Sequence, residues 1–117
     1  MIALYGLKNC DSCRRALTWM REQTLPFNFY DVRETPPDSA LLRAAMTAFG
    51  VEVLVNKRST TWRQLDDSQR GLESQDAAIA LLTEYPTLMK RPLLVVSGAP
   101  LTVGFKSSEA AWQSLTL

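Results

Sequence analysis

Histidine is absent from the 117-residue sequence, and cysteine occurs only twice. Without histidine, a Ser-His-Asp triad, a Cys-His pair and every imidazole metal site are excluded within this chain. Two cysteines cannot supply the four ligands of a closed zinc site, and they are too few for a disulfide-stapled secreted domain. These exclusions leave the two thiols as the main candidates for covalent chemistry.

Excess charge of one sign and long apolar runs are also missing. Thirteen basic residues face twelve acidic ones, for a net charge of +1. This balance argues against a nucleic-acid or polybasic membrane surface, and no apolar run approaches the about 18 residues that cross a bilayer. The N-terminal segment lacks the basic start and apolar stretch of a signal peptide. We therefore expect a cytoplasmic monomer that binds neither nucleic acid nor membrane.

The length of the chain is typical of one domain, so we expect residues 1–117 to fold as a single unit. The short apolar run at 2–5 predicts a buried strand. Residues 11–23 have the apolar spacing of an amphipathic helix, and alternation over 27–32 predicts a second strand. Together they predict a β-α-β unit with parallel strands and a right-handed crossover.

The middle of the chain has a more helical pattern. Asp38 is a candidate N-cap for a helix that Gly50 ends. Residues 51–55 have strand propensity, but five residues cannot separate a strand from a buried helical turn. Residues 56–72 predict a loop with short helical turns, and 75–85 predict a further helix.

The C-terminal part predicts two strands and a helix. Residues 93–96 and 101–103 form a candidate hairpin, and 107–115 form a helix with Ala110, Ala111 and Leu115 facing inward. The complete order indicates a thioredoxin-like α/β fold. It has a mixed four-stranded sheet flanked by helices, with a helical insertion between the β-α-β and β-β-α units.

The motif Cys10-Asp11-Ser12-Cys13 lies where the first strand meets the first helix. A cysteine at a helix start faces unpaired backbone N–H groups, and in such motifs its pKa falls from about 8.5 to about 3.5–7.5. Cys13, one turn later, could attack a mixed disulfide on Cys10. The alternative is that both are small buried hydrophobic residues, which suits Cys13 because it lies on the apolar stripe. We expect Cys10 to be the more exposed and more acidic thiol, able to form a disulfide with Cys13.

Three separated segments give a more specific signal than the two cysteines. In order along the chain, they are LYGLKNCDSCRRALTWM, NKRSTTWRQLDD, and MKRPLLV followed by GF. With these motifs the chain resembles the arsenate-reductase-like (ArsC/Spx) family, and most of all its YffB branch, while the Spx regulators are more distant. The resemblance implies a thioredoxin fold with a helical insertion and the nucleophile at Cys10.

The resemblance also assigns roles to residues beyond the cysteines. Arg91 matches the arginine that contacts a substrate oxyanion or glutathione, and Pro92 matches the cis-proline beside the thiol. The arsenate reductases carry three arginines around the cysteine. Here Asn56 replaces one of them, with Arg58 two residues later, and Lys106 replaces another. Lysine lacks the planar fork suited to an oxyanion, so we expect Arg58 and Lys106 to bind substrate but arsenate reduction to be inefficient.

These observations lead to three functional hypotheses. The first is a thiol oxidoreductase that uses Cys10, holds no bound cofactor and takes glutathione as co-substrate. Its partners would be thiol or disulfide substrates, and either Cys13 or glutathione would resolve the adduct. The second is a Spx-like redox-sensing regulator that binds RNA polymerase, and the third is an arsenate reductase. For the first, Arg91 must project toward Cys10.

Overall fold

The computed structural model describes all residues 1–117 and contains one mixed four-stranded sheet with helices on both sides. The strands and α-helices are β1 (Ile2–Gly6), α1 (Asp11–Glu22), β2 (Asn28–Asp31), α2 (Ser39–Phe49), α3 (Val51–Leu54), α4 (Thr60–Gln64), α5 (Gln75–Glu84), β3 (Leu93–Val96), β4 (Ala99–Val103) and α6 (Ala110–Gln113). Short 3-10 turns are η1 (Asp67–Gln69), η2 (Pro86–Leu88) and η3 (Ser114–Thr116).

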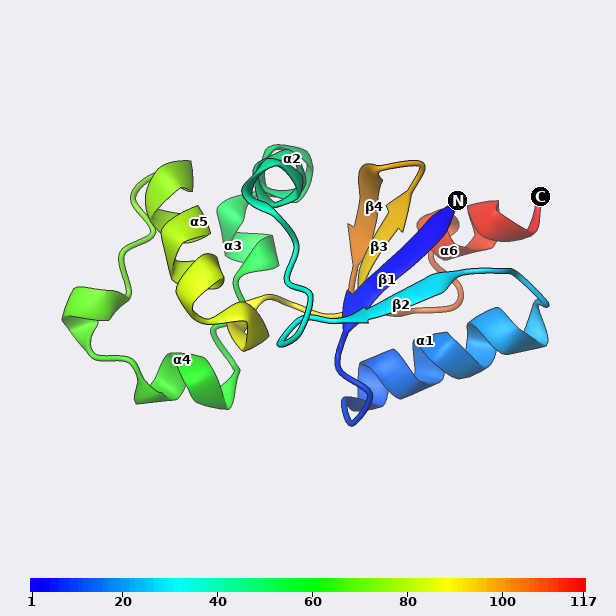
Figure 1. Cartoon of the computed structure of the whole chain (residues 1–117), viewed down its shortest axis with the longest axis horizontal. Helices are drawn as coiled ribbons and strands as arrows, with labels where there is room; N and C mark the ends of the chain where they lie inside the picture. Colours follow the sequence, from blue (N-terminus) through cyan, green and yellow to red (C-terminus); the bar gives the residue numbers. More distant parts are fainter.

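The strands lie in the order β2-β1-β3-β4. β1 is parallel to β2 and antiparallel to β3, and β3 and β4 form the antiparallel hairpin. Helices α2 to α5 gather on one side of the sheet, and α1 and α6 lie on the other (Figure 1). The predicted fold class, a thioredoxin-like sheet with a helical insertion before the hairpin, is therefore confirmed.

An aromatic cluster fixes α1 and the C-terminus on their side of the sheet. Trp112 is fully buried, and its ring meets those of Trp19 and Phe105 at centroid distances of 5.8 Å and 4.8 Å. Its indole N–H donates to the carbonyl of Gly104 over 3.3 Å. The indole therefore has a partner for its polar atom as well as a packed ring, as a buried tryptophan requires.

The C-terminal helix differs from the prediction. Its α-helical part is Ala110–Gln113 only, and a 3-10 turn continues the chain. Ala110 is exposed, Ala111 and Leu115 are half-buried, and the fully buried residue is Trp112. The large indole gains more from burial than two alanine methyl groups can, so it sets the rotation of this short helix.

Of the two alternatives for residues 51–55, the buried helical turn forms and the strand does not. Val51–Leu54 forms a turn of helix, after Gly50 at φ +93° ends α2. Leu54 is fully buried while Val53 remains 44% exposed, so burial of Leu54 overrides the strand propensity of the valines. Only Val55 pairs like a strand, in an isolated antiparallel bridge to Met89.

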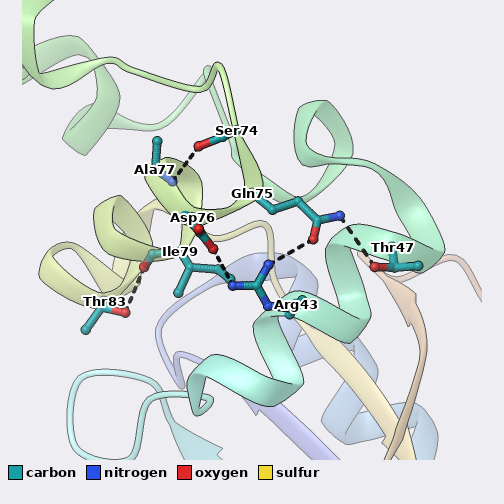
Figure 2. Close-up of polar contacts among 8 residues, drawn as sticks. All are labelled: Arg43, Thr47, Ser74, Gln75, Asp76, Ala77, Ile79 and Thr83. Atoms are coloured by element: carbon teal, nitrogen blue, oxygen red, sulfur yellow. Dashed lines mark hydrogen bonds and ion pairs between the residues drawn. The ribbon is translucent and has the colours of Figure 1, made fainter.

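The helical insertion carries its own capping and polar contacts. As predicted, Asp38 caps α2, where its Oδ1 accepts from the Leu41 N–H over 2.8 Å. Figure 2 shows that Arg43 of α2 donates to Gln75 and pairs with the Asp76 carboxylate at the start of α5. These side chains are exposed, so they orient α5 on α2 with a small contribution to stability. None of the helices has the length and apolar character needed to span a membrane.

The packing predicts that a buried and an exposed substitution lower the free energy of unfolding by different amounts. Trp112→Ala should lower the free energy of unfolding by about 3–5 kcal/mol, because it empties a buried aromatic site. Arg43→Ala, the control at an exposed contact, should lower it by less than about 1 kcal/mol. Urea unfolding followed by circular dichroism measures both. Equal costs would contradict the assignment of the aromatic cluster as the main support of this side of the sheet.

Candidate functional site

The pairing of β1 with β3 brings two distant segments together. Tyr5 of β1 is opposite Leu93 of β3 in the antiparallel register. The segment that follows β1 and the segment that precedes β3 therefore lie at the same end of these two central strands. The first carries Cys10, and the second carries Arg91 and Pro92.

Cys10 is the N-cap residue of α1. Its backbone is extended, with φ −93° and ψ 130°, and its carbonyl accepts the first helical hydrogen bond, from the Arg14 N–H over 2.8 Å. Its own N–H donates to the Leu7 carbonyl over 3.3 Å, which closes the loop between strand and helix. The half-buried thiol thus lies at the positive end of the helix, as the sequence predicts.

The surroundings of Cys10 favour its thiolate. Burial is the largest single influence and raises the pKa of this thiol. The Cys13 backbone N–H, the Cys13 thiol and the Arg91 guanidinium together outweigh burial, so the pKa lies below the ordinary thiol value of 9.0. Donors and a positive charge around the sulfur stabilise its charged form.

Cys13 lies in the opposite environment. Its side chain is only 1% exposed, and its Sγ accepts from the Leu7 N–H over 3.4 Å. Burial raises the pKa of Cys13 to about 12, with the neighbouring Cys10 adding to the rise. The fit is close: a Cβ at Gly6 would lie 2.5 Å from the Cys13 sulfur, so only glycine leaves room for it. Cys13 therefore stays a thiol and can donate a proton toward Cys10.

Arg91 and Pro92 complete the group around Cys10. The peptide bond between them is cis, which confirms the prediction for this bond. The guanidinium of Arg91 lies by the Cys10 sulfur, and its Nη1 donates to the carbonyls of Thr87 and Met89. Pro92 is buried, and its carbonyl accepts from the Gly104 N–H over 2.9 Å. Arg91 also lowers the pKa of the Cys10 thiol, as expected of a guanidinium oriented toward it, while its role in binding substrate stays a prediction.

The other two predicted binding residues lie apart from this group. Arg58 is exposed and lines a groove of about 580 Å³ together with Lys57, Lys90 and Glu52. Lys106 is exposed in the segment after β4. Neither side chain forms an ion pair or hydrogen-bonds to a cysteine. Their roles in substrate binding remain predictions.

Several groups that shape the site were not predicted from the sequence. The Leu7 amide bonds to Cys13, and the Thr87 carbonyl anchors Arg91, but backbone groups leave no mark on the sequence. Gly6 is a residue whose role sequence reasoning missed, although a glycine at the end of a strand, four residues before Cys10 and seven before Cys13, is a usable signal for close packing. No three metal-binding side chains lie together anywhere in the structure.

The fold and the cysteine at the helix start define a thioredoxin-fold protein with a thiol site. The ArsC family matches residues 5–112, and the chain belongs to this family. An uncharacterised protein of Haemophilus influenzae is 42% identical over 109 residues, which cover 93% of this chain and 95% of the relative. The global transcriptional regulator Spx of Enterococcus faecalis is 32% identical over 111 residues, covering 93% and 83%. A solved structure of a YffB protein superposes with a TM-score of 0.89 at 32% identity, over the whole of both chains.

The similarity to Spx corrects one prediction. The expected partners were a thiol or disulfide substrate, with nucleic acid excluded, yet relatives that match 93% of this chain are transcriptional regulators. The exclusion is wrong because it was based on net charge, which describes only the average field of the molecule. That average does not describe local surfaces such as the groove lined by Lys57, Arg58, Lys90 and Glu52.

The contrast between the two thiols predicts the order of alkylation. Iodoacetamide should modify Cys10 first, at a pH below about 8, because the thiolate is the reacting species. Cys13 should stay unmodified in the folded protein. Tandem mass spectrometry of the peptide that contains both residues identifies the labelled sulfur, and Cys10→Ser should remove the fast reaction while Cys13→Ser keeps it. Labelling of Cys13 first would contradict the site described above.

Proposed function

We propose that the chain is a thiol oxidoreductase in which the Cys10 thiolate attacks the disulfide bond of a substrate. The observation that carries this proposal is the convergence of the α1 start and the Arg91 guanidinium on one half-buried sulfur. A thiolate, an accessible sulfur and a nearby cation are the features of reactive cysteines in general. Membership of the ArsC family supports the same class of chemistry.

The proposed reaction is a series of thiol–disulfide exchange steps. The Cys10 thiolate attacks one sulfur of a disulfide R–S–S–R′, forms Cys10–S–S–R and releases R′S⁻. A second thiolate then attacks the Cys10 sulfur, releases RS⁻ and leaves a new disulfide. When that second thiolate is glutathione, the new disulfide is Cys10–S–SG. A second glutathione thiolate then attacks the glutathione sulfur, releases the Cys10 thiolate and forms oxidised glutathione, so each cycle oxidises two glutathione molecules and reduces the substrate to two thiols.

The environment of Cys13 favours glutathione over Cys13 as the second thiol. Cys13 is buried, and its pKa of about 12 keeps it protonated at neutral pH. A protonated thiol is a poor nucleophile, but it can donate a hydrogen bond that stabilises the Cys10 thiolate. Reduced glutathione is abundant in the cytoplasm, the compartment that we propose for this protein.

Arg91 would serve both the thiolate and the substrate. Its Nη1 donates to backbone carbonyls, and the guanidinium lowers the pKa of the Cys10 thiol through a hydrogen bond and its charge. A planar fork at this position suits a carboxylate of glutathione. Arsenate would need further bidentate donors, and Arg58 lies in a separate groove, which makes arsenate reduction the weaker proposal.

A redox-sensing transcriptional regulator is the second candidate. The similarity to Spx regulators over 93% of the chain favours it, and the same Cys10–Cys13 pair would serve as the redox switch. Capture of RNA polymerase subunits by the purified chain, dependent on the oxidation state of the pair, would support the regulator. Catalytic turnover of a disulfide substrate with glutathione would support the oxidoreductase.

Oxidised glutathione provides the direct test. The wild type should gain the mass of one glutathionyl group on Cys10, and the adduct should disappear on addition of reduced glutathione. Arg91→Ala should slow adduct formation by about tenfold or more, because a charge-assisted contact is lost. Arg91→Lys should slow the reaction with glutathione more than the reaction with neutral iodoacetamide, since lysine restores the charge without the fork.

Two controls define failure of the proposed function. Cys10→Ser should form no adduct, and Cys13→Ser should form one that reduced glutathione removes, as in the wild type. An adduct on Cys13, or a wild type that forms no adduct while Cys10 still reacts with iodoacetamide, would reject glutathione as the co-substrate. A mass two hydrogens lower, without glutathione, would instead identify Cys13 as the resolving thiol.

A further inference from the structure

We propose that Thr61 and Thr87 are positioning residues, whose paired hydroxyls hold the Arg91 guanidinium beside the Cys10 sulfur. The proposal rests on the role of Cys10 as nucleophile proposed above. It assigns to the helical insertion a part in setting the reactivity of a thiol that the insertion itself does not contain.

Arg91 is anchored at one end of its guanidinium. Nη1 donates to the carbonyl of Thr87 and, over 3.4 Å, to that of Met89. Nε is buried and has no hydrogen-bond partner. No carboxylate pairs with this guanidinium, so its position depends on where the two carbonyls lie.

Thr87 connects that anchor to the insertion. Its hydroxyl is 3.0 Å from the hydroxyl of Thr61, and both residues are half-buried. The backbone on the C-terminal side of Thr87 is held separately, by the Asn56 N–H on the Leu88 carbonyl and the Lys90 N–H on the Leu54 carbonyl. The hydroxyl pair is therefore the side-chain contact that fixes the carbonyl of residue 87 relative to α4.

The helix that carries Thr61 is itself restrained. Ser59 caps α4, where its hydroxyl accepts from the Trp62 N–H over 3.1 Å. Arg70 donates to the Trp62 carbonyl over 3.1 Å, and the indole lies between Arg70 and Lys57 at 5.4 Å and 5.7 Å. Each of these contacts limits the motion of the residue next to Thr61. A restrained α4 makes the hydroxyl of Thr61 a fixed point for Thr87.

The other charges near the thiol influence it less than Arg91 does. Arg14 in the first turn of α1 pairs with Asp11 over 3.4 Å and donates to the Asn9 carbonyl over 3.1 Å. Lys8 is exposed in the loop before the helix. Arg91 is the charged side chain with the largest influence on Cys10. A small displacement of the Arg91 guanidinium therefore changes the pKa of Cys10 more than a displacement of the Arg14 or Lys8 side chain would.

The test is the pH dependence of Cys10 alkylation by iodoacetamide in the full chain. Thr61→Val and Thr87→Val should each lower the rate at a pH below the thiol pKa by about threefold, the effect of a rise of half a pKa unit. The double variant should lower it no further, because both substitutions break the same contact. Thr61→Ser, which keeps the hydroxyl, should retain the wild-type profile.

Thr83→Val is the matched control. It removes a threonine hydroxyl of the same insertion that bonds only to the Ile79 carbonyl within α5 (Figure 2), and it should leave the profile unchanged. Equal pH profiles for Thr61→Val and Thr83→Val would overturn the proposal. A Thr61→Ser variant that reacts as slowly as Thr61→Val would also overturn it, because the serine keeps the hydroxyl. If the Thr61→Val and Thr87→Val proteins do not fold, Thr61→Ala and Thr87→Ala take their place. An unchanged pH profile of Cys10 alkylation in the alanine variants would also overturn the proposal. Alkylation needs no glutathione, so failure of the glutathione reaction would leave this test intact.

Discussion

The contact between the Arg91 guanidinium and the Cys10 sulfur is the interaction on which the site depends. It joins residues from opposite ends of the chain, and it exists because the antiparallel register of β1 and β3 sets Tyr5 opposite Leu93. The sheet thus brings the helix start and the cis-proline segment to one edge. Neither segment alone places a cation beside a thiolate.

Burial separates the two cysteines into different chemical roles. Both lie in the first turn of one helix, yet Cys10 is half-buried and favoured as a thiolate, while Cys13 is enclosed and stays protonated. Gly6 makes this possible by leaving room for the Cys13 sulfur against β1. The same geometry suits a catalyst and a redox switch, which is consistent with a family that includes transcriptional regulators.

Local patterns predicted the elements well, and long-range contacts account for what they missed. The helix start at Cys10 follows from apolar spacing, and the cis bond before Pro92 followed from the family resemblance alone. The turn at 51–55 became helical because burial of Leu54 outweighed valine propensity. The Thr61–Thr87 contact spans 26 positions, and no local pattern encodes such a pair.

The most direct test of the account is an NMR titration of the protein with ¹³C at the cysteine β-carbons. The account predicts that Cys10 titrates below 9.0 and that Cys13 stays a thiol until about pH 12. It also predicts that Arg91→Gln raises the pKa of Cys10, because this change removes the charge beside its sulfur. Two thiols that titrate together, or a Cys10 curve that Arg91→Gln leaves in place, would contradict the central role of this contact.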